Sequence, residues 1–194
     1  MFTRLILMIQ FLTRIPIPIA LNVTEEDFGK GLAFAPLVGL LIGSLTAVVY
    51  YGAAYLSQGI FAAVTAVVFY IFITGGLHID GLGDTFDGLF SNRPKDRILE
   101  IMRDSRVGTN AVIAIVAVIL LNISSICAIP QEAIYKALIF MPIAGRLGSV
   151  CSAGMARYAR SGEGLGRAFI DICGIREIMI GAAITLILGI LFFG

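Results

Sequence analysis

Long apolar segments alternate with short polar stretches along this chain of 194 residues. Five such segments stand out, at residues 31–56, 59–77, 107–129, 133–156 and 178–193. A membrane-spanning helix needs about 20 apolar residues, so the first four are long enough to cross a bilayer. The last reaches only about 24 Å, against a hydrocarbon core about 30 Å thick. The pattern predicts an all-α, polytopic integral membrane helical bundle with about five transmembrane spans.

The N-terminal stretch predicts one more helix, over residues 3–15. Gln10 and Arg14 interrupt its apolar run, and no small-residue cleavage site follows, so a removable signal peptide is disfavoured. Pro16 and Pro18 are expected to end the helix, because proline lacks a backbone N–H and restricts the residue before it. We expect this helix to lie at the membrane interface.

Composition supports a membrane protein with a single domain. Hydrophobic residues make up 58% of the chain and charged residues only 14%, with a mean hydropathy of +0.96. The net charge of +1 predicts no nucleic-acid partner. Three cysteines without metal-site spacing are expected to be small buried hydrophobes: Cys127, Cys151 and Cys173. With no repeat or linker visible, we expect one membrane-embedded catalytic domain over residues 1–194.

The basic residues predict an orientation in the membrane. Lys and Arg gather in the N-terminal segment and in the stretches 78–106 and 157–176, whereas the links at 57–58 and 130–132 carry none. Cytoplasmic loops carry the excess of Lys and Arg in membrane proteins. We therefore expect a multi-pass protein of the cell (inner) membrane whose N-terminus and two long loops are cytoplasmic.

The chemistry begins at "TGGLHIDGLGDTFDGLF", residues 74–90, where Asp80, Asp84 and Asp87 follow an apolar run. On a helix their i, i+4, i+7 spacing places them within about 60° of one another. Clustered carboxylates repel each other unless a cation lies among them, and all-oxygen ligands favour Mg²⁺, Mn²⁺ or Ca²⁺. Three flanking glycines are expected to let a large ligand approach the backbone: Gly81, Gly83 and Gly88.

Two further residues stand out because each is unusual in its place. His78 is the only histidine, and the roles of base, metal ligand, phosphate donor and helix-end hydrogen-bonding group all stay open for it. Arg146 falls in the middle of an apolar span, where a charged side chain is costly and points to function. Its alternative role is a structural pair with one of the aspartates.

Arginines in both long loops favour a phosphate ligand. Arg103, Asp104 and Arg106 precede the third span, whose helix N-terminus attracts anions. Arg157, Arg160 and Gly164 belong to a flexible basic stretch after the fourth span. Because arginine binds phosphate in a bidentate manner, metal-binding carboxylates and arginines on one face predict phosphoryl or phosphodiester transfer at the membrane surface. Membrane anchoring remains the simpler interpretation of Arg93, Lys95 and Arg97.

Several motifs in order resemble the cobalamin synthase family, also called adenosylcobinamide-GDP ribazoletransferase. They are "FLTRIPIP", "FAPLVGLLIG", "GGLHIDGLGDTFDG", "LEIMRDSRVGT", "GR" at 145–146 and "YARSGEGLGRAF", and they run from about residue 11 to 169. The two central motifs are long and specific. Family members usually extend further at the C-terminus, so the end at Gly194 leaves open a truncated chain or a short member.

The resemblance implies a reaction, in which α-ribazole or its 5′-phosphate displaces GMP from adenosylcobinamide-GDP and gives adenosylcobalamin or its phosphate. It implies Mg²⁺ as cofactor, the two substrates and the lipid bilayer as partners, and leaves a homo-oligomer open. We expect three groups of residues to act: metal ligands Asp80, Asp84 and Asp87, catalytic residues His78, Asp104, Arg106 and Arg146, and substrate- or cofactor-binding residues Arg103, Arg157, Arg160 and Gly164.

Two other functions remain as alternatives at this stage. A CDP-alcohol phosphotransferase also carries several aspartates on membrane helices, but the full signature of that group is not present here. A secondary transporter could use Asp80, His78 and Arg146 as an ion or proton path, yet transporter acids usually lie at mid-bilayer and inverted repeats are common. The aspartates here lie at the mouth of a loop.

Overall fold

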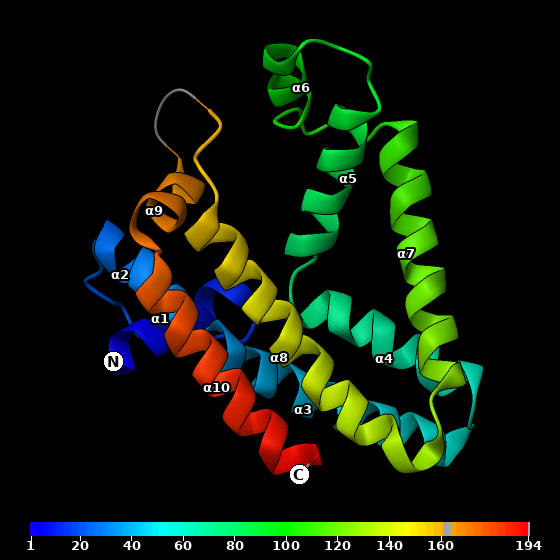
Figure 1. Cartoon of the computed structure of the whole chain (residues 1–194). Helices are drawn as coiled ribbons and strands as arrows, with labels where there is room; N and C mark the ends of the chain where they lie inside the picture. Colours follow the sequence, from blue (N-terminus) through cyan, green and yellow to red (C-terminus); the bar gives the residue numbers. More distant parts are fainter. Residues whose placement is uncertain (161–163, 194) are drawn as a thin grey trace.

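The computed structural model describes residues 1–160 and 164–193, and within them the regular elements are all helical (Figure 1). In chain order they are α1 (Phe2–Leu12), α2 (Glu25–Gly31), the 3₁₀ helix η1 (Leu32–Phe34), α3 (Ala35–Leu56), α4 (Ile60–Ile73), α5 (Leu77–Leu89), α6 (Lys95–Ile101), α7 (Thr109–Ala128), α8 (Gln131–Met155), α9 (Leu165–Ile172) and α10 (Ile175–Phe193). The all-α prediction is confirmed.

Four helical stretches in the described part are long and apolar enough to cross a membrane: Glu25–Leu56, Thr109–Ala128, Gln131–Met155 and Ile175–Phe193. A fifth candidate is the pair of α4 and α5, which passes the same test as a unit but bends by 88° at its break. The predicted multi-pass architecture of about five spans is therefore confirmed, with one span broken in two.

The break lies inside the second predicted span, residues 59–77. Helix α4 ends at Ile73, and the chain then turns through Gly75 and Gly76, which adopt φ values of +64° and +71°. Residues that carry a Cβ rarely adopt a positive φ, so this turn depends on its two glycines. We call the turn at residues 74–76 the elbow. It starts α5 in a new direction, so the acidic motif stands on a helix of its own.

Close packing of α3 against α8 forms the centre of the bundle. A Cβ at Gly39 would lie 2.6 Å from the carbonyl oxygen of Pro142, and one at Gly43 would collide with the backbone of Ile139. The absence of these side chains lets the two backbones touch, as small residues do in membrane helix pairs. Other glycines of the spans differ, since Gly52, Gly145 and Gly148 face open space.

Both ends of the chain differ from the sequence expectation. Helix α1 ends at Leu12, three residues early, because Thr13 is already extended and its hydroxyl donates to the carbonyl of Ile9 at 2.7 Å. Helix α10 begins at Ile175 and has 19 residues, so it is about 28 Å long and starts three residues before the apolar segment at 178–193. Glu177, buried in its first turn, accepts a hydrogen bond from Gly174 N–H at 3.0 Å.

The two long loops lie at the same end of the molecule (Figure 1). One runs from α5 through α6 to α7, and the other joins α8 to α9. Lys95 and Arg103 of the first loop line a common cavity with Arg160 of the second. The sequence prediction that these loops share one side is therefore confirmed.

Candidate functional site

A cavity of about 310 Å³ brings the acidic motif together with the first arginine motif. We call it the loop cavity. From α5 it is lined by Asp80, Asp84 and Asp87, and from the stretch before α7 by Arg103, Asp104 and Arg106. Because α5 packs along α7, the i, i+4, i+7 stripe faces the residues that lead into α7. Two motifs separated in sequence thus form one charged site.

Asp87 has a structural task within this cavity. Its Oδ2 accepts from Gly108 N–H at 2.6 Å and its Oδ1 from Ala111 N–H at 2.9 Å. Both amides belong to the start of α7, which has no side-chain cap of its own, so Asp87 acts as that cap from a neighbouring helix. Each oxygen retains a second lone pair, so the metal-ligand role of Asp87 stays a prediction.

The remaining two aspartates suit Mg²⁺ in number and kind. Among the residues that the structure describes, no three His, Cys, Asp or Glu side chains converge as a ready metal site. However, Mg²⁺ is usually held by one or two carboxylates, with waters and substrate phosphates completing its shell. Asp80 and Asp84 are one helical turn apart and line the same cavity. Their donor set therefore fits an ion shared between protein and substrate.

Asp104 and Arg106 form a bidentate ion pair at the rim of the loop cavity. The distances are 3.0 Å from Arg106 Nε to Asp104 Oδ1 and 2.5 Å from Nη2 to Oδ2, and the backbone N–H of Arg106 also donates to Asp104. Hydrogen bonds from the Arg106 side chain, helped by its backbone, lower the pKa of Asp104 to about 2. The pair is solvent-exposed, so its value lies in orienting the guanidinium rather than in stability.

The second loop contributes Arg160 but not every residue expected from it. Arg103 lines the loop cavity and also a neighbouring cavity of about 390 Å³, which Arg160 lines from the other side. Arg160 is also close enough for its charge to act on Asp84. Arg157 is exposed and lines neither cavity, and Gly164 lies at the start of α9 beside Tyr158. Residues 161–163 of this motif lie outside the described part.

Arg146 lies inside the bundle next to His78. It is 3% exposed, and its Nη1 lies 3.4 Å from His78 Nε2. A guanidinium only donates, so His78 Nε2 is the acceptor and the imidazole proton is assigned to Nδ1. Nε and Nη2 of Arg146 are buried without a partner among the described residues. The alternative role for Arg146, a pair with an aspartate, is wrong, since its neighbour is a histidine.

The glycines of the acidic helix have different tasks from those expected. A Cβ at Gly83 would press on Ala111 of α7 at 3.2 Å, and one at Gly88 would meet Met102 at 2.6 Å. Both positions pack α5 against its neighbours, but Gly83 also lines the loop cavity, so ligand approach stays a prediction for Gly83 and is wrong for Gly88. Gly81 alone of the three faces open space, with nothing within 4 Å of a built Cβ.

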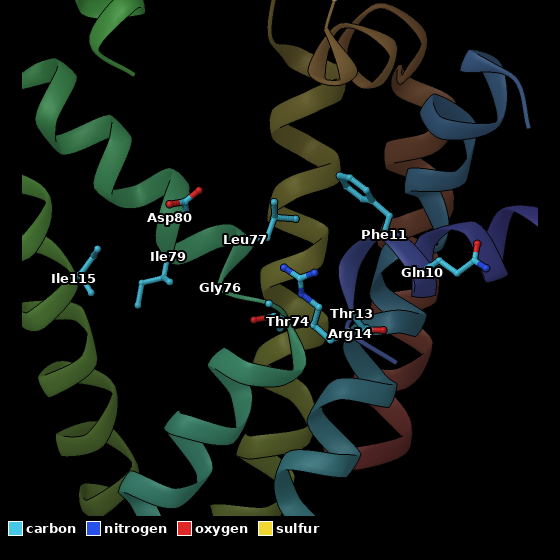
Figure 2. Close-up of a pocket in the computed structure, with 11 residues that line it drawn as sticks. Gln10, Phe11, Thr13, Arg14, Thr74, Gly76, Leu77, Ile79, Asp80 and Ile115 are labelled. Carbon is cyan, nitrogen blue, oxygen red and sulfur yellow. The ribbon is translucent and has the colours of Figure 1, made fainter. Parts of the chain in front are cut away.

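A larger cavity, of about 580 Å³, lies at the elbow (Figure 2). We call it the elbow cavity; among its lining residues are Gln10, Thr13 and Arg14 from the end of α1, Gly75 and Gly76, and Asp80. Arg14, which lines this cavity, was interpreted from the sequence only as a membrane-flanking charge. The signal available was its place inside "FLTRIPIP", one of the motifs that carried the resemblance.

Comparison with known proteins identifies a family for the chain. The family model described as cobalamin-5-phosphate synthase matches residues 4–194. Adenosylcobinamide-GDP ribazoletransferase of Acetivibrio thermocellus is 52% identical over 188 residues, covering 97% of this chain and 76% of the relative. The protein of the same name from Clostridium acetobutylicum is 57% identical over 180 residues, covering 93% and 71%. No solved structure matches the chain.

Proposed function

The chain belongs to the cobalamin-5-phosphate synthase family, and on that premise we propose how its residues carry out the reaction. The protein is an adenosylcobinamide-GDP ribazoletransferase, an enzyme of cobalamin nucleotide-loop assembly. A hydroxyl of α-ribazole, or of its 5′-phosphate, attacks the phosphorus that carries the cobinamide arm. A new P–O bond forms, the phosphoanhydride bond to GMP breaks, and the hydroxyl loses its proton. The observation that carries the proposal is the loop cavity, where carboxylates and arginines meet.

Asp80 and Asp84 are the proposed ligands of Mg²⁺. When bound, the ion would neutralise charge on the pyrophosphate and make the phosphorus more electrophilic. The two carboxylates project from successive turns of α5, so the helix sets their separation. Asp87 fixes α5 to the start of α7 and so keeps the carboxylates opposite the arginines. Asp87 can also complete the metal shell through its second lone pairs.

Arg103 and Arg106 are proposed to receive the departing GMP. Negative charge develops on the leaving phosphate, and a preoriented guanidinium stabilises it without reorganisation during the reaction. Asp104 supplies that orientation for Arg106 through two side-chain contacts. Arg160, at the far wall of the adjoining cavity, is placed to screen charge near Asp84. Arg157 and Gly164 belong to the same basic stretch, and their substrate-binding role remains a proposal from the sequence.

Arg146, which lies on α8 beside His78 of α5, is proposed to bind an anionic group of the substrate. Buried polar groups are normally hydrogen-bonded, so two unpartnered nitrogens on a buried guanidinium favour an anionic ligand. His78 holds the guanidinium by accepting from Nη1, which makes it a positioning residue. This role leaves the identity of the base open, because Nε2 is already occupied by Arg146.

We also propose that the loop cavity faces the cytoplasm and that residues 1–194 form one catalytic domain. The orientation is supported by the Lys and Arg that gather in both long loops, and by the bare links on the other side. Both substrates would then reach the site from the compartment where nucleotides are abundant. The bilayer surrounds the apolar outer faces of α7 and α10, which expose many large hydrophobic side chains.

The test is nucleotide release by the purified protein. We expect Mg²⁺-dependent release of GMP from adenosylcobinamide-GDP when α-ribazole or its 5′-phosphate is supplied, and loss of that release with EDTA. A CDP-alcohol phosphotransferase would instead release CMP from a CDP-alcohol, and a transporter would release neither nucleotide. GMP release that survives complete removal of divalent ions would overturn the metal part of the proposal.

A further inference from the structure

The elbow cavity and the loop cavity meet at one wall. Asp80 of α5 and Ile115 of α7 line both of them. The loop cavity extends from this wall toward Arg103 and Arg106, whereas the elbow cavity extends toward the end of α1 and Arg14 (Figure 2). The proposed metal ligand Asp80 therefore stands between two spaces, each of which contains arginine.

Arg14 is held in place but has no anionic partner. Its backbone N–H donates to the carbonyl of Ile73, the last residue of α4, at 2.7 Å. Its guanidinium crosses Gly75 so closely that a Cβ there would lie 2.9 Å from Arg14 Cζ. Within the described residues the Arg14 side chain makes no hydrogen bond or ion pair, unlike Arg4, which contacts Asp27 at 3.0 Å. The fold thus positions a cation and leaves its donors available.

Apart from Asp80, the other polar side chains of the elbow cavity already donate hydrogen bonds within the protein. The hydroxyl of Thr13 donates to Ile9, and that of Thr74 donates to Tyr70 at 2.8 Å. The amide nitrogen of Gln10 donates to two backbone carbonyls at 3.0 and 3.1 Å. The available charged group on the α1 side is therefore Arg14, whose five N–H donors suit a phosphate.

The reaction itself says which substrate belongs in this space. In a phosphoryl displacement the attacking and leaving oxygens lie roughly in line on opposite sides of the phosphorus. With GMP leaving toward Arg103 and Arg106, the attacking hydroxyl must approach from the other side of the metal-binding carboxylates. The elbow cavity is the space that adjoins Asp80 there.

We propose that the elbow cavity is the acceptor subsite, and that Arg14 binds the 5′-phosphate of α-ribazole 5′-phosphate. This inference rests on the proposed function. That phosphate takes no part in the bond changes, so Arg14 acts on binding and acceptor preference rather than on chemistry. Arg14 thereby makes the enzyme favour the phosphorylated acceptor over free α-ribazole, while Asp80 and the metal serve both acceptors alike.

The test compares the two acceptors in the full-length protein. Arg14→Gln should raise the KM for α-ribazole 5′-phosphate about 10- to 100-fold, the loss expected for a charge-assisted hydrogen bond. The KM for unphosphorylated α-ribazole and the KM for adenosylcobinamide-GDP should stay within about twofold of wild type. Arg14→Lys should restore part of the preference, because it keeps the charge but loses the fork. The matched control is Arg97→Gln, an exposed arginine paired with Glu100 on α6.

Each other outcome contradicts the proposal. Equal effects on both acceptors would mean that Arg14 does not read the phosphate, and a selective rise in the KM for adenosylcobinamide-GDP would give the elbow cavity to the nucleotide substrate. If Arg14→Gln lowers the yield of folded protein, binding of radiolabelled α-ribazole 5′-phosphate is compared between wild type and Arg14→Lys. Weaker binding to Arg14→Lys supports the proposal, and equal binding contradicts it. Failure of the proposed function itself would look different, because wild type would then release no GMP with either acceptor.

Discussion

The backbone nitrogen of Gly108 lies 2.6 Å from the Asp87 carboxylate, so a side chain of α5 caps the start of helix α7. A Cβ at position 108 would lie 2.6 Å from the nearer carboxylate oxygen, and the approach therefore depends on glycine. The contact connects the acidic motif to the arginine motif directly. It also gives Asp87 a role that is separable from metal binding.

The first prediction separates these two roles of Asp87. Asp87→Ala removes both acceptors of the cap, which costs about 0.5–2 kcal/mol, so we expect thermal unfolding in detergent about 2–6 °C below wild type. Asp87→Asn keeps one acceptor and should lose less. If Asp87 only caps α7, the Mg²⁺ concentration that gives half-maximal GMP release should be the same in Asp87→Asn as in wild type. A large increase in that concentration would show that Asp87 binds the metal as well.

The second prediction concerns the metal ligands. Asp84→Asn keeps the size of the side chain but removes the charge, and we expect GMP release to fall at least about 100-fold because the ion loses half of its protein carboxylates. Expression and unfolding temperature should stay near wild type. Glu132→Gln is the matched control and should be fully active, because Glu132 lies in the first turn of α8, at the end away from the loop cavity. Wild-type turnover in Asp84→Asn would exclude the metal role.

The third prediction divides the arginines into chemical and anchoring groups. Arg106→Lys keeps the charge but loses the bidentate contact with Asp104, so turnover should fall about 10-fold or more. Arg97→Lys should keep wild-type turnover, because Arg97 is exposed, pairs with Glu100 and does not line the loop cavity. GMP release at equal protein level measures both. The reverse ranking of the two variants would show that the division is wrong.

The fourth prediction is a pH profile. Because Arg106 lowers the pKa of Asp104 from 3.8 to about 2, the ionised pair is fully formed above about pH 4 and is lost as the pH falls toward 2. Asp104 therefore stays charged throughout the range from pH 5 to 9. We expect Asp104→Asn to lower kcat by a similar factor at every pH in that range. A variant whose acid limb moved relative to wild type would show that Asp104 titrates during catalysis.

The fifth prediction tests the orientation in intact cells. In a variant without the three native cysteines, Asp96→Cys on α6 should resist a membrane-impermeant thiol reagent added from outside. Gln58→Cys, in the link between α3 and α4, should react. Membrane permeabilisation should make the first position reactive. Labelling of Asp96→Cys from outside would move the loop cavity to the other face.

Local periodicity was enough to predict the helices and the acidic stripe. The spacing of Asp80, Asp84 and Asp87 has a helical period, and α5 confirms it. The elbow could also have been predicted, because two consecutive glycines mark a turn. The second span was instead predicted to continue through them to Leu77. The short α4 follows from that turn.

Contacts between distant residues could not be predicted from the pattern. His78 and Arg146 are 68 positions apart, and their meeting depends on how α5 sits against α8. The same holds for Asp87 and the start of α7, where a cap comes from another helix and leaves no local signature. Arg14 presents a different problem. A basic residue near a span is normally interpreted as a membrane anchor, and only the structure shows that its guanidinium lies against Gly75 of the elbow.

The elbow also determines which changes of length this part of the chain can accept. Only three residues separate Gly76 from Asp80, and they form the first turn of α5. One residue inserted there would rotate the carboxylates by about 100° around the helix and turn them away from α7. Substitutions that preserve the helix keep the geometry, whereas gains or losses of a single residue do not. Between the elbow and Asp87, therefore, the number of residues matters more for the site than the identity of the solvent-facing ones.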